Sequence, residues 1–310
     1  MKAWFGDIEF VDGRTIVRPS GKTPEEISEY LPATDSTGLN KDVRLDEIAI
    51  GSDICDDFDS YRKLLHETSL ALARDRITAS HSSKDAYLIQ AVKALDDVNE
   101  SYNIITERLT EWYAVHYPEL SVRPQELIRF ILDFGSREAS GSPEASSSMG
   151  APLSEADEAA VKSLAMSARV LFDERKALEK YITSNMEEIA PNLSGLMGPL
   201  LGARLISRAG SLERLAKLPA STIQVMGAGE ALFKHIKSGT PSPKHGIIFK
   251  HPLISGSPKR VRGKVSRMIA AKAAIAARID YYSGDVVDIG SDLKEKVSEI
   301  KKRTPSRRKK

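Results

Sequence analysis

The sequence has little cysteine and no long apolar run. Cys55 is the single cysteine among 310 residues, so it cannot form a disulfide within the chain. We predict that it is a small buried side chain in a reducing, cytoplasmic setting. No apolar stretch approaches the roughly 20 residues of a membrane-spanning helix, and Met1–Phe10 lacks the basic-then-apolar pattern of an export signal. These absences exclude a disulfide framework and argue against a membrane partner.

Signatures of common catalytic sites are also missing. The six histidines show no paired metal-ligand spacing. The sequence contains neither the Gly-rich patterns of nucleotide-binding loops nor the Gly-x-Ser-x-Gly pattern of hydrolases. Gly227-Ala228-Gly229 resembles the start of a phosphate-binding loop, but no Lys-Ser/Thr pair follows it. We therefore predict a protein without a metal, cofactor or catalytic site of its own.

Charge is divided unevenly along the chain, although the net charge is only +2. Residues 191–310 hold 24 Lys and Arg against 8 Asp and Glu, a net +16, whereas residues 1–190 hold 21 against 35, a net −14. The basic part suits a phosphate backbone, because binding releases counterions. The acidic part suits protein partners or simple solvation. The division predicts two kinds of partner.

Residues 1–80 have the pattern of a small α/β domain. Lys2–Phe10 and Thr15–Arg18 are predicted strands joined by a turn. Thr23 has the residue type and context of a helix cap, and a second helix is predicted at Asp57–Arg74.

Residues 81–190 are predicted to form a long antiparallel coiled-coil hairpin. Apolar residues recur at alternating spacings of three and four over more than three heptads, and a second stretch has compatible spacing. Arg175 interrupts the second stretch at one seam position. Residues 117–153 include a Ser/Gly/Pro/Ala-rich stretch and are predicted to be a flexible tip.

A stripe of this length predicts that two copies pair through the hairpin; the alternative is that it packs only on its own chain. The predicted dimerisation seam comprises Leu88, Leu95, Val98, Tyr102, Ile105, Leu109, Trp112, Leu164, Leu171, Leu178 and Ile182.

Residues 191–295 are predicted to form a compact all-α domain, followed by a basic tail at residues 296–310. A loop within residues 238–263 contains several prolines, so it loses little entropy on binding. Imidazoles can stack on unpaired bases, and Lys and Arg can reach phosphates. The loop side chains predicted to contact RNA are Lys244, His245, Lys250, His251, Lys259, Arg260 and Arg262.

Three alternatives stay open for these loop residues. The cations could form only a solvated face, and His245 and His251 could be buried and hydrogen-bonded. His235, His245 or His251 could also act as general acids or bases of an RNA-processing enzyme. Glu230 is the only carboxylate near them in the sequence.

Residues 84–290 contain a series of different short motifs. They are Glu111-Trp112-Tyr113, His116-Tyr117-Pro118-Glu119-Leu120, Ser148-Met149-Gly150, Ile189-Ala190-Pro191-Asn192-Leu193, Gly202-Ala203-Arg204-Leu205-Ile206, Ala209-Gly210-Ser211-Leu212, Leu218-Pro219-Ala220-Ser221-Thr222-Ile223-Gln224-Val225, Pro243-Lys244-His245-Gly246, His251-Pro252 and Ala276-Ala277-Arg278-Ile279-Asp280-Tyr281. Together they resemble the archaeal Nop-domain scaffold of box C/D ribonucleoproteins. This family is related to two eukaryotic nucleolar Nop proteins and, more distantly, to a spliceosomal pre-mRNA processing factor.

The resemblance implies a mainly α fold and a scaffold that is not itself an enzyme. It implies that residues 1–80 hold fibrillarin, the methyltransferase that carries S-adenosylmethionine, and that the hairpin pairs two copies. It also implies that residues 191–295 form a Nop domain, which binds box C/D guide RNA together with a small kink-turn-binding protein. Such a particle methylates ribose 2′-hydroxyls of rRNA or tRNA. A spliceosome-like particle is an alternative, but the nucleolar form matches more closely.

The resemblance adds further residues to the predicted interface. It places Gly246 within the contact loop and the basic residues of the following helix on the same side. The family motif Gly-Ala-Glu-Lys-Ala-Leu-Phe-Arg reads Gly-Ala-Gly-Glu-Ala-Leu-Phe-Lys here. Glu230 stands where the family has a lysine, so a contact made by that positive charge is not expected at this position. Lys234 stands where the family has an arginine and lacks the planar, two-point hydrogen bonding of a guanidinium. The residues added on this ground are Lys234, Gly246, Lys264 and Arg267.

Overall fold

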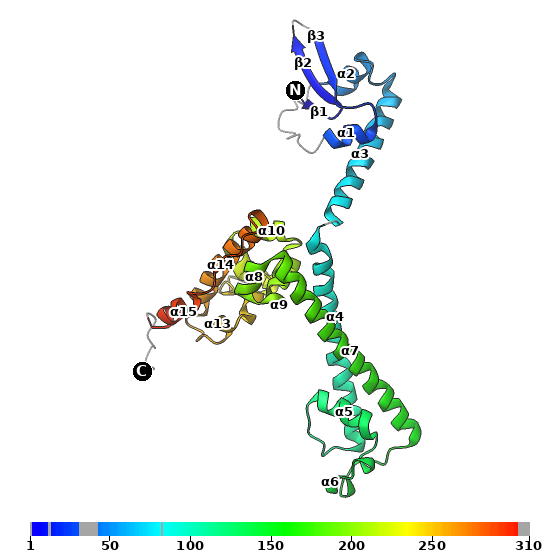
Figure 1. Cartoon of the computed structure of the whole chain (residues 1–310), viewed down its shortest axis with the longest axis vertical. Helices are drawn as coiled ribbons and strands as arrows, with labels where there is room; N and C mark the ends of the chain where they lie inside the picture. Colours follow the sequence, from blue (N-terminus) through cyan, green and yellow to red (C-terminus); the bar gives the residue numbers. More distant parts are fainter. Residues whose placement is uncertain (1, 12–13, 31–42, 82, 303–310) are drawn as a thin grey trace. The chain divides into compact units, whose positions relative to one another are not determined.

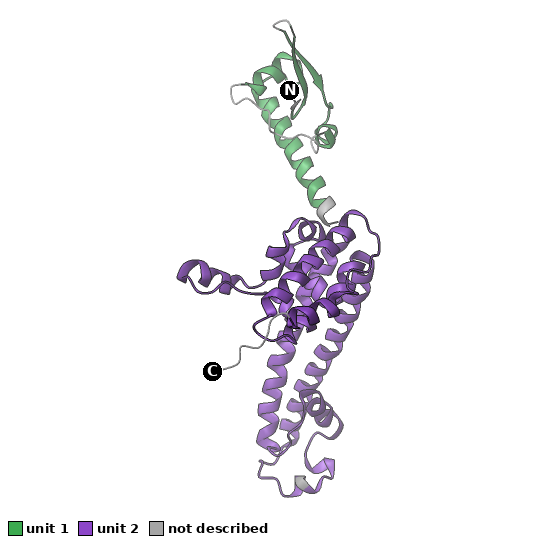
Figure 2. Ribbon diagram, turned by 90° about the vertical axis from the view of Figure 1, so that its left-hand side faces the viewer, with its two compact units in different colours: residues 1–83 green, residues 84–310 purple. Residues whose placement is uncertain are grey.

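The fold is mainly helical, as predicted. The computed structural model describes four stretches of the chain, residues 2–11, 14–30, 43–81 and 83–302. The chain divides into two compact units, residues 1–83 and residues 84–310 (Figure 2). None of the described helices has both the length and the apolar character that crossing a membrane requires.

The first unit contains an antiparallel sheet with the strand order β1-β2-β3. Its core includes Phe5, Ile8 and the buried Cys55. The predicted strand Thr15–Arg18 is confirmed within β3, whereas the predicted strand Lys2–Phe10 is two antiparallel strands, β1 and β2, joined by a turn at Trp4 and Phe5. Thr23 accepts a hydrogen bond from the backbone N–H of Glu26 at 3.3 Å, as expected of a helix cap. The elements are β1 (Lys2–Ala3), β2 (Gly6–Val11), β3 (Arg14–Pro19), α1 (Pro24–Tyr30), α2 (Leu45–Gly51) and α3 (Phe58–His81).

Two long helices, α4 (Lys84–His116) and α7 (Glu155–Ile189), form a hairpin in the second unit (Figure 1). The start of α4 shares a core with the end of α7, whereas the later part of α4 packs on the start of α7, so the helices are antiparallel. The Ser154 hydroxyl caps α7 by accepting from the backbone N–H of Asp157 at 3.1 Å. The hairpin buries much of the predicted seam within one chain.

The buried stripe of α4 departs from strict heptad spacing near the end of the helix. Leu109 is fully buried, but the next core residue is Tyr113, and Trp112 is 41% exposed. An α-helix drifts by about 20° per heptad relative to a 3.5-residue repeat, so a long straight helix moves its buried face by one position. On α7, Arg175 lies over the Tyr102 ring at 5.6 Å from its centroid, which explains how the seam accommodates a charged residue.

The far end of the hairpin has a core of its own. This segment, which the sequence predicted to be a flexible tip, contains α5 (Pro124–Phe134), η2 (Glu138–Ser140) and α6 (Pro143–Ser146). Its core joins residues of α4, α5, α6 and α7: Tyr102, Leu109, Tyr113, Tyr117, Leu127, Ile128, Ile131, Ala145, Val161, Ala165 and Ala168.

A buried polar network also closes the tip. The His116 ring is 2% exposed; Nδ1–H donates to the Ala151 carbonyl at 2.8 Å and Nε2 accepts from the backbone N–H of Arg137 at 2.9 Å. The Arg137 guanidinium donates to the His116 carbonyl. These bonds satisfy both ring nitrogens and hold residues distant in sequence together, in addition to the apolar core of the tip.

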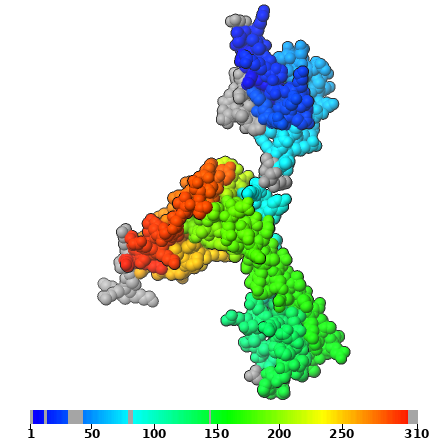
Figure 3. Space-filling view, viewed as in Figure 1, coloured from blue at the N-terminus to red at the C-terminus, as the bar shows by residue number. Residues whose placement is uncertain are grey.

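Most of the remaining helices pack against the open end of the hairpin and form a compact body (Figure 3), whereas α12 (Gly229–Ser238) has no buried residue and contributes none to this core. Leu88 and Leu95 of α4 and Ile182 and Met186 of α7 belong to the same core as these helices. The base of the hairpin and the C-terminal body are therefore one packed unit. The helices are α8 (Pro191–Met197), α9 (Pro199–Ala209), α10 (Leu212–Lys217), α11 (Ala220–Val225), α12 (Gly229–Ser238), η3 (Ile247–Lys250), α13 (Pro252–Ser255), α14 (Arg262–Tyr282) and α15 (Leu293–Lys302).

Candidate nucleic-acid interface

The segment Pro243–Gly246 is fixed against the end of α11 by backbone hydrogen bonds. The N–H of Gly246 donates to the Gln224 carbonyl and the N–H of Ile247 donates to the Met226 carbonyl, both at 2.8 Å. A Cβ atom on Gly246 would overlap the Met226 carbonyl oxygen. The glycine of this motif is therefore required by the close approach of two backbones.

Lys244 is exposed next to this anchor. Its backbone carbonyl accepts a hydrogen bond from Gln224 Nε2 at 2.7 Å. The bond fixes the backbone from which the exposed Lys244 side chain extends. The Lys244 side chain lies along Gly263, where a Cβ atom would be 3.7 Å from it. The structure thus brings Lys244 to the start of α14, next to Arg262.

His245 is half-buried and stacked on an aromatic ring. Its imidazole lies 4.6 Å from the Phe249 ring, centroid to centroid, with 18° between the planes. Partial burial, followed by the nearby positive charges of Arg262 and Lys244, lowers the pKa of His245 below its ordinary value of 6.5. The ring is therefore neutral at pH 7 and suited to stacking rather than to charge pairing.

His251 lies in the interior, although the sequence grouped it with the RNA contacts. It is 7% exposed; its Nε2 donates to the Leu196 carbonyl and its Nδ1 accepts from the N–H of Leu253, both at 3.2 Å. Burial lowers its pKa. This side chain caps α13 and cannot reach a ligand at the surface, so the buried alternative applies to it.

Arg262 is also engaged within the chain. Its Nε donates to the Ser257 carbonyl at 2.7 Å, a terminal nitrogen donates to the Ser255 carbonyl at 3.2 Å, and its guanidinium carbon lies 5.1 Å from the Phe249 ring centroid. The other predicted cations of this region have exposed side chains: Lys250, Lys259, Arg260, Lys264 and Arg267.

Residues 227–234, where the sequence differs from the family motif, form the start of α12 and part of a shallow groove. Gly227 has a φ of +81° and contacts Ile247, so the motif lies against the 3₁₀ turn that follows the loop. Arg208 of α9 and Glu230 both line the groove. Lys234 is exposed on α12, as are Phe233 and Ile236 at 64% and 76%.

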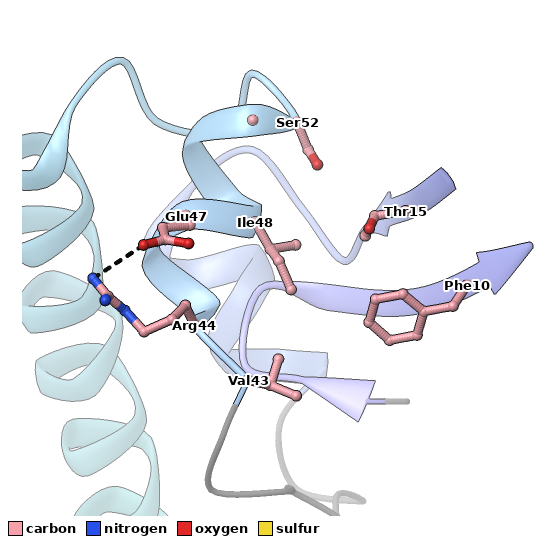
Figure 4. A pocket seen from close by; sticks show the side chains of 8 residues that line it. Phe10, Thr15, Val43, Arg44, Glu47, Ile48 and Ser52 are labelled. Atoms are coloured by element: carbon pink, nitrogen blue, oxygen red, sulfur yellow. Dashed lines mark ion pairs between the residues drawn. The ribbon is translucent and has the colours of Figure 1, made fainter. Parts of the chain in front are cut away.

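The first unit carries a separate surface hollow between its sheet and α2. Phe10 on β2, Thr15 on β3 and Ile48 on α2 border it, and Arg44 pairs with Glu47 at 3.3 Å on one side (Figure 4). Among the described residues, no three His, Cys, Asp or Glu side chains are grouped to hold a metal ion.

Sequence reasoning missed two residues that shape the loop, Phe249 and Gln224. Phe249 follows His245 by four positions, a spacing that brings side chains together in helical segments. The 3₁₀ turn η3, which contains Phe249, could not be predicted in a proline-rich stretch. Gln224 lies twenty positions before Lys244 and carried no local signal. His251 was assigned to the surface because residue type alone does not reveal burial.

Comparisons with known proteins show which family the chain belongs to. The family model described as Nop, snoRNA binding domain, fibrillarin, matches residues 94–302. A NOP5 family protein of Methanocaldococcus jannaschii is 37% identical over 91% of this chain and 73% of its own length. Nucleolar protein 58 of Sclerotinia sclerotiorum is 38% identical over 69% of this chain, and that of Candida glabrata is 36% identical over 75%.

The chain spans 41% of the Sclerotinia protein and 50% of the Candida protein. Among solved structures, a chain of a fibrillarin/Nop5p complex is 29% identical, with 97% of this chain and 98% of that chain covered and a TM-score of 0.46. A helical body with a fixed, basic loop fits a nucleic-acid-binding class of protein, which is the class that the family description names. The family model and the sequence identities show that the chain belongs to the Nop family.

Proposed function

We propose that this chain is a non-catalytic scaffold of a box C/D-type ribonucleoprotein, which directs RNA-guided 2′-O-methylation of rRNA or tRNA. In this proposal it bridges fibrillarin to a guide RNA bound by a small kink-turn-binding protein. The observation that carries the proposal is the fixed loop at Pro243–Gly246, which presents exposed Lys244 and stacked His245 within a segment of net charge +16. The lone, buried Cys55 fits a cytoplasmic particle.

The loop offers two kinds of contact to a folded RNA, one to a phosphate and one to an unpaired base. Lys244 can neutralise a phosphate, which contributes affinity through counterion release. His245 is held as a neutral aromatic ring, which can stack on an unpaired base. Because the Lys244 carbonyl and the backbone N–H groups of Gly246 and Ile247 are hydrogen-bonded, little conformational entropy is lost when RNA binds.

The double variant Lys244→Ala/His245→Ala tests this assignment. We expect it to weaken assembly on a kink-turn RNA already bound by its small protein by about thirtyfold to several hundredfold, since one charge contact and one stacked base each contribute roughly 1–2 kcal/mol. Gel-shift titration at one fixed salt concentration measures the affinity. A matched variant, Lys180→Ala, changes an exposed lysine of the hairpin and should bind as the wild type does. Equal affinity of the double variant and the wild type would remove the loop from the interface.

Self-association through the hairpin forms part of the proposal. Ile105, Met166, Val170 and Leu171 line an apolar groove along α4 and α7, with Met166 and Val170 exposed at 53% and 60%. The fully buried seam residues are used within the chain, so we assign the pairing of two copies to this exposed groove instead. Exposed apolar surface beside a long hairpin favours association.

Fibrillarin docking is assigned to the first unit. The hairpin of β2 and β3 leaves Phe10, Val11 and Ile16 exposed at 60%, 47% and 46%, next to the hollow beside α2. Apolar side chains gathered at one edge of a small domain favour a protein partner over RNA. The acidic balance of residues 1–190 points the same way.

A histidine-dependent RNA-processing enzyme is the alternative. Within the described part of the chain, the charged groups that lower the pKa of His245 are the cations Arg262 and Lys244, and neither of them can serve as the carboxylate partner of acid–base chemistry. Incubation of the purified protein alone with labelled RNA separates the two functions. The scaffold requires inactivity until fibrillarin and S-adenosylmethionine are added. RNA cleavage that is lost in His245→Ala would support the enzyme.

A further inference from the structure

Phe249 connects the loop to the start of α14 through two ring contacts. The His245 imidazole is nearly parallel to the Phe249 ring, and the Arg262 guanidinium carbon lies 5.1 Å from the centroid of the same ring. Parallel and cation–π contacts of this kind have restricted geometry. The orientation of His245 therefore depends on Phe249 and on the residue that fixes Phe249.

Arg262 makes two hydrogen bonds through two different guanidinium nitrogens, a geometry that the single ammonium group of a lysine cannot reproduce. Its guanidinium donates to the backbone carbonyls of Ser255 and Ser257, and Ser257 is itself 2% exposed with its hydroxyl donating to the Leu253 carbonyl at 2.6 Å. Two donors in one plane satisfy two carbonyls while the flat face remains available for the ring. These bonds use two of the five N–H donors of the guanidinium and fix the direction in which the remaining ones point.

We propose that Phe249 and Arg262 are positioning residues, which orient the His245 ring for contact with an unpaired RNA base. Arg262 acts through this arrangement, and not by binding a phosphate. The inference rests on the proposed RNA-binding function of the loop. The lowered pKa of His245 agrees with a ring that is partly shielded by its neighbours.

The first experiment examines the free, full-length protein and needs no RNA. NMR of histidine-labelled protein follows the His245 ring signals, which are assigned by their loss in His245→Ala. Stacking on Phe249 shifts these signals through the ring current. In Phe249→Leu we expect that shift to disappear and the titration midpoint of His245 to rise toward its ordinary value, because a shielding ring has been removed. Phe249→Tyr retains the ring and should resemble the wild type.

The second experiment measures assembly on the kink-turn RNA with its small protein. Phe249→Leu and Arg262→Lys should each weaken binding by roughly twofold to tenfold, the range expected for loss of one aromatic contact. In a His245→Ala background neither change should weaken binding further, because there is no ring left to orient. Arg129→Lys, at an exposed position of α5, is the control for the arginine-to-lysine exchange.

The outcomes separate this inference from the function on which it rests. Unchanged His245 signals in Phe249→Leu overturn the positioning role, whatever RNA binding does. If Arg262→Lys weakens binding equally with and without His245, Arg262 contacts RNA directly and the inference is wrong. If His245→Ala itself binds normally, the proposed function of the loop fails and this inference falls with it. Thermal unfolding verifies that each variant is folded. If Phe249→Leu does not fold, Arg262→Lys alone tests the positioning role.

Discussion

At the scale of single residues, Gly246 is the position where the loop tolerates least change. We predict that Gly246→Ala destabilises the protein by about 1–3 kcal/mol, because the added methyl group overlaps the Met226 carbonyl and must displace one of two backbones. Urea unfolding measures the change. Gly229→Ala is the matched control: a Cβ atom there meets nothing within 4 Å, so its stability should equal or exceed that of the wild type.

His251 predicts how stability depends on pH. Burial holds its pKa below 6.5 in the folded state, so the unfolded chain binds the proton more readily. The contribution of neutral His251 is complete above pH 6.5 and is lost as the pH falls toward the folded-state pKa. Urea unfolding at pH 7.5 and 5.0 should show a larger loss for the wild type than for His251→Asn, which can still cap α13 but cannot titrate. Equal losses would contradict this account.

Residue roles could be predicted only where the signal was local. The proline-rich loop, its glycine and its exposed Lys244 follow from residues that are neighbours in the sequence. His251 and Arg262 have the residue types of RNA contacts, yet one is buried and the other is bonded to two carbonyls. Their roles depend on Leu196 of α8 and on the Phe249 ring, which only the folded chain brings close.

At the scale of elements, the apolar groove of the hairpin makes a prediction about self-association. We expect Val170→Asp to abolish pairing of two copies without unfolding the chain, because the new carboxylate stays solvated in the single chain and is buried without an opposite charge only when a partner covers it. Light scattering gives the mass, and circular dichroism gives the helix content. Lys180→Asp, at an exposed α7 position outside the groove, should leave the mass unchanged. A wild type that is monomeric at the same concentration would refute the pairing.

The helices themselves were predictable from periodicity, because apolar residues recur for more than three heptads in α4 and at compatible spacing in α7. The end of the seam was not. The sequence pattern ends at Trp112, but the accumulated helical drift buries Tyr113, whose hydroxyl donates to the Gly135 carbonyl at 2.9 Å. The network of His116 and Arg137 joins segments about twenty residues apart, and the low-complexity stretch gave no sign of it.

At the scale of the whole molecule, the two units should be separable in function. We predict that Phe10→Ser/Ile16→Ser abolishes guided methylation but leaves RNA affinity unchanged, because both side chains are exposed in the first unit. Methyl transfer is measured with fibrillarin and labelled S-adenosylmethionine, and affinity by gel shift. Glu9→Ser/Arg14→Ser changes exposed polar residues of the same strands and serves as the control. Methylation at the wild-type level would exclude this edge as the docking surface.

The shared core of the second unit also governs how the chain can be divided for laboratory work. Leu88, Leu95, Ile182 and Met186 fill the space beneath α8 and α9, so a fragment that starts at residue 191 would uncover a large apolar face and aggregate. A fragment intended for crystallisation or binding assays has to retain α4 and α7. The tip has a core separate from that of the C-terminal body, so it can be shortened without uncovering that body, provided that the parts of α4 and α7 that pack on the tip are shortened with it.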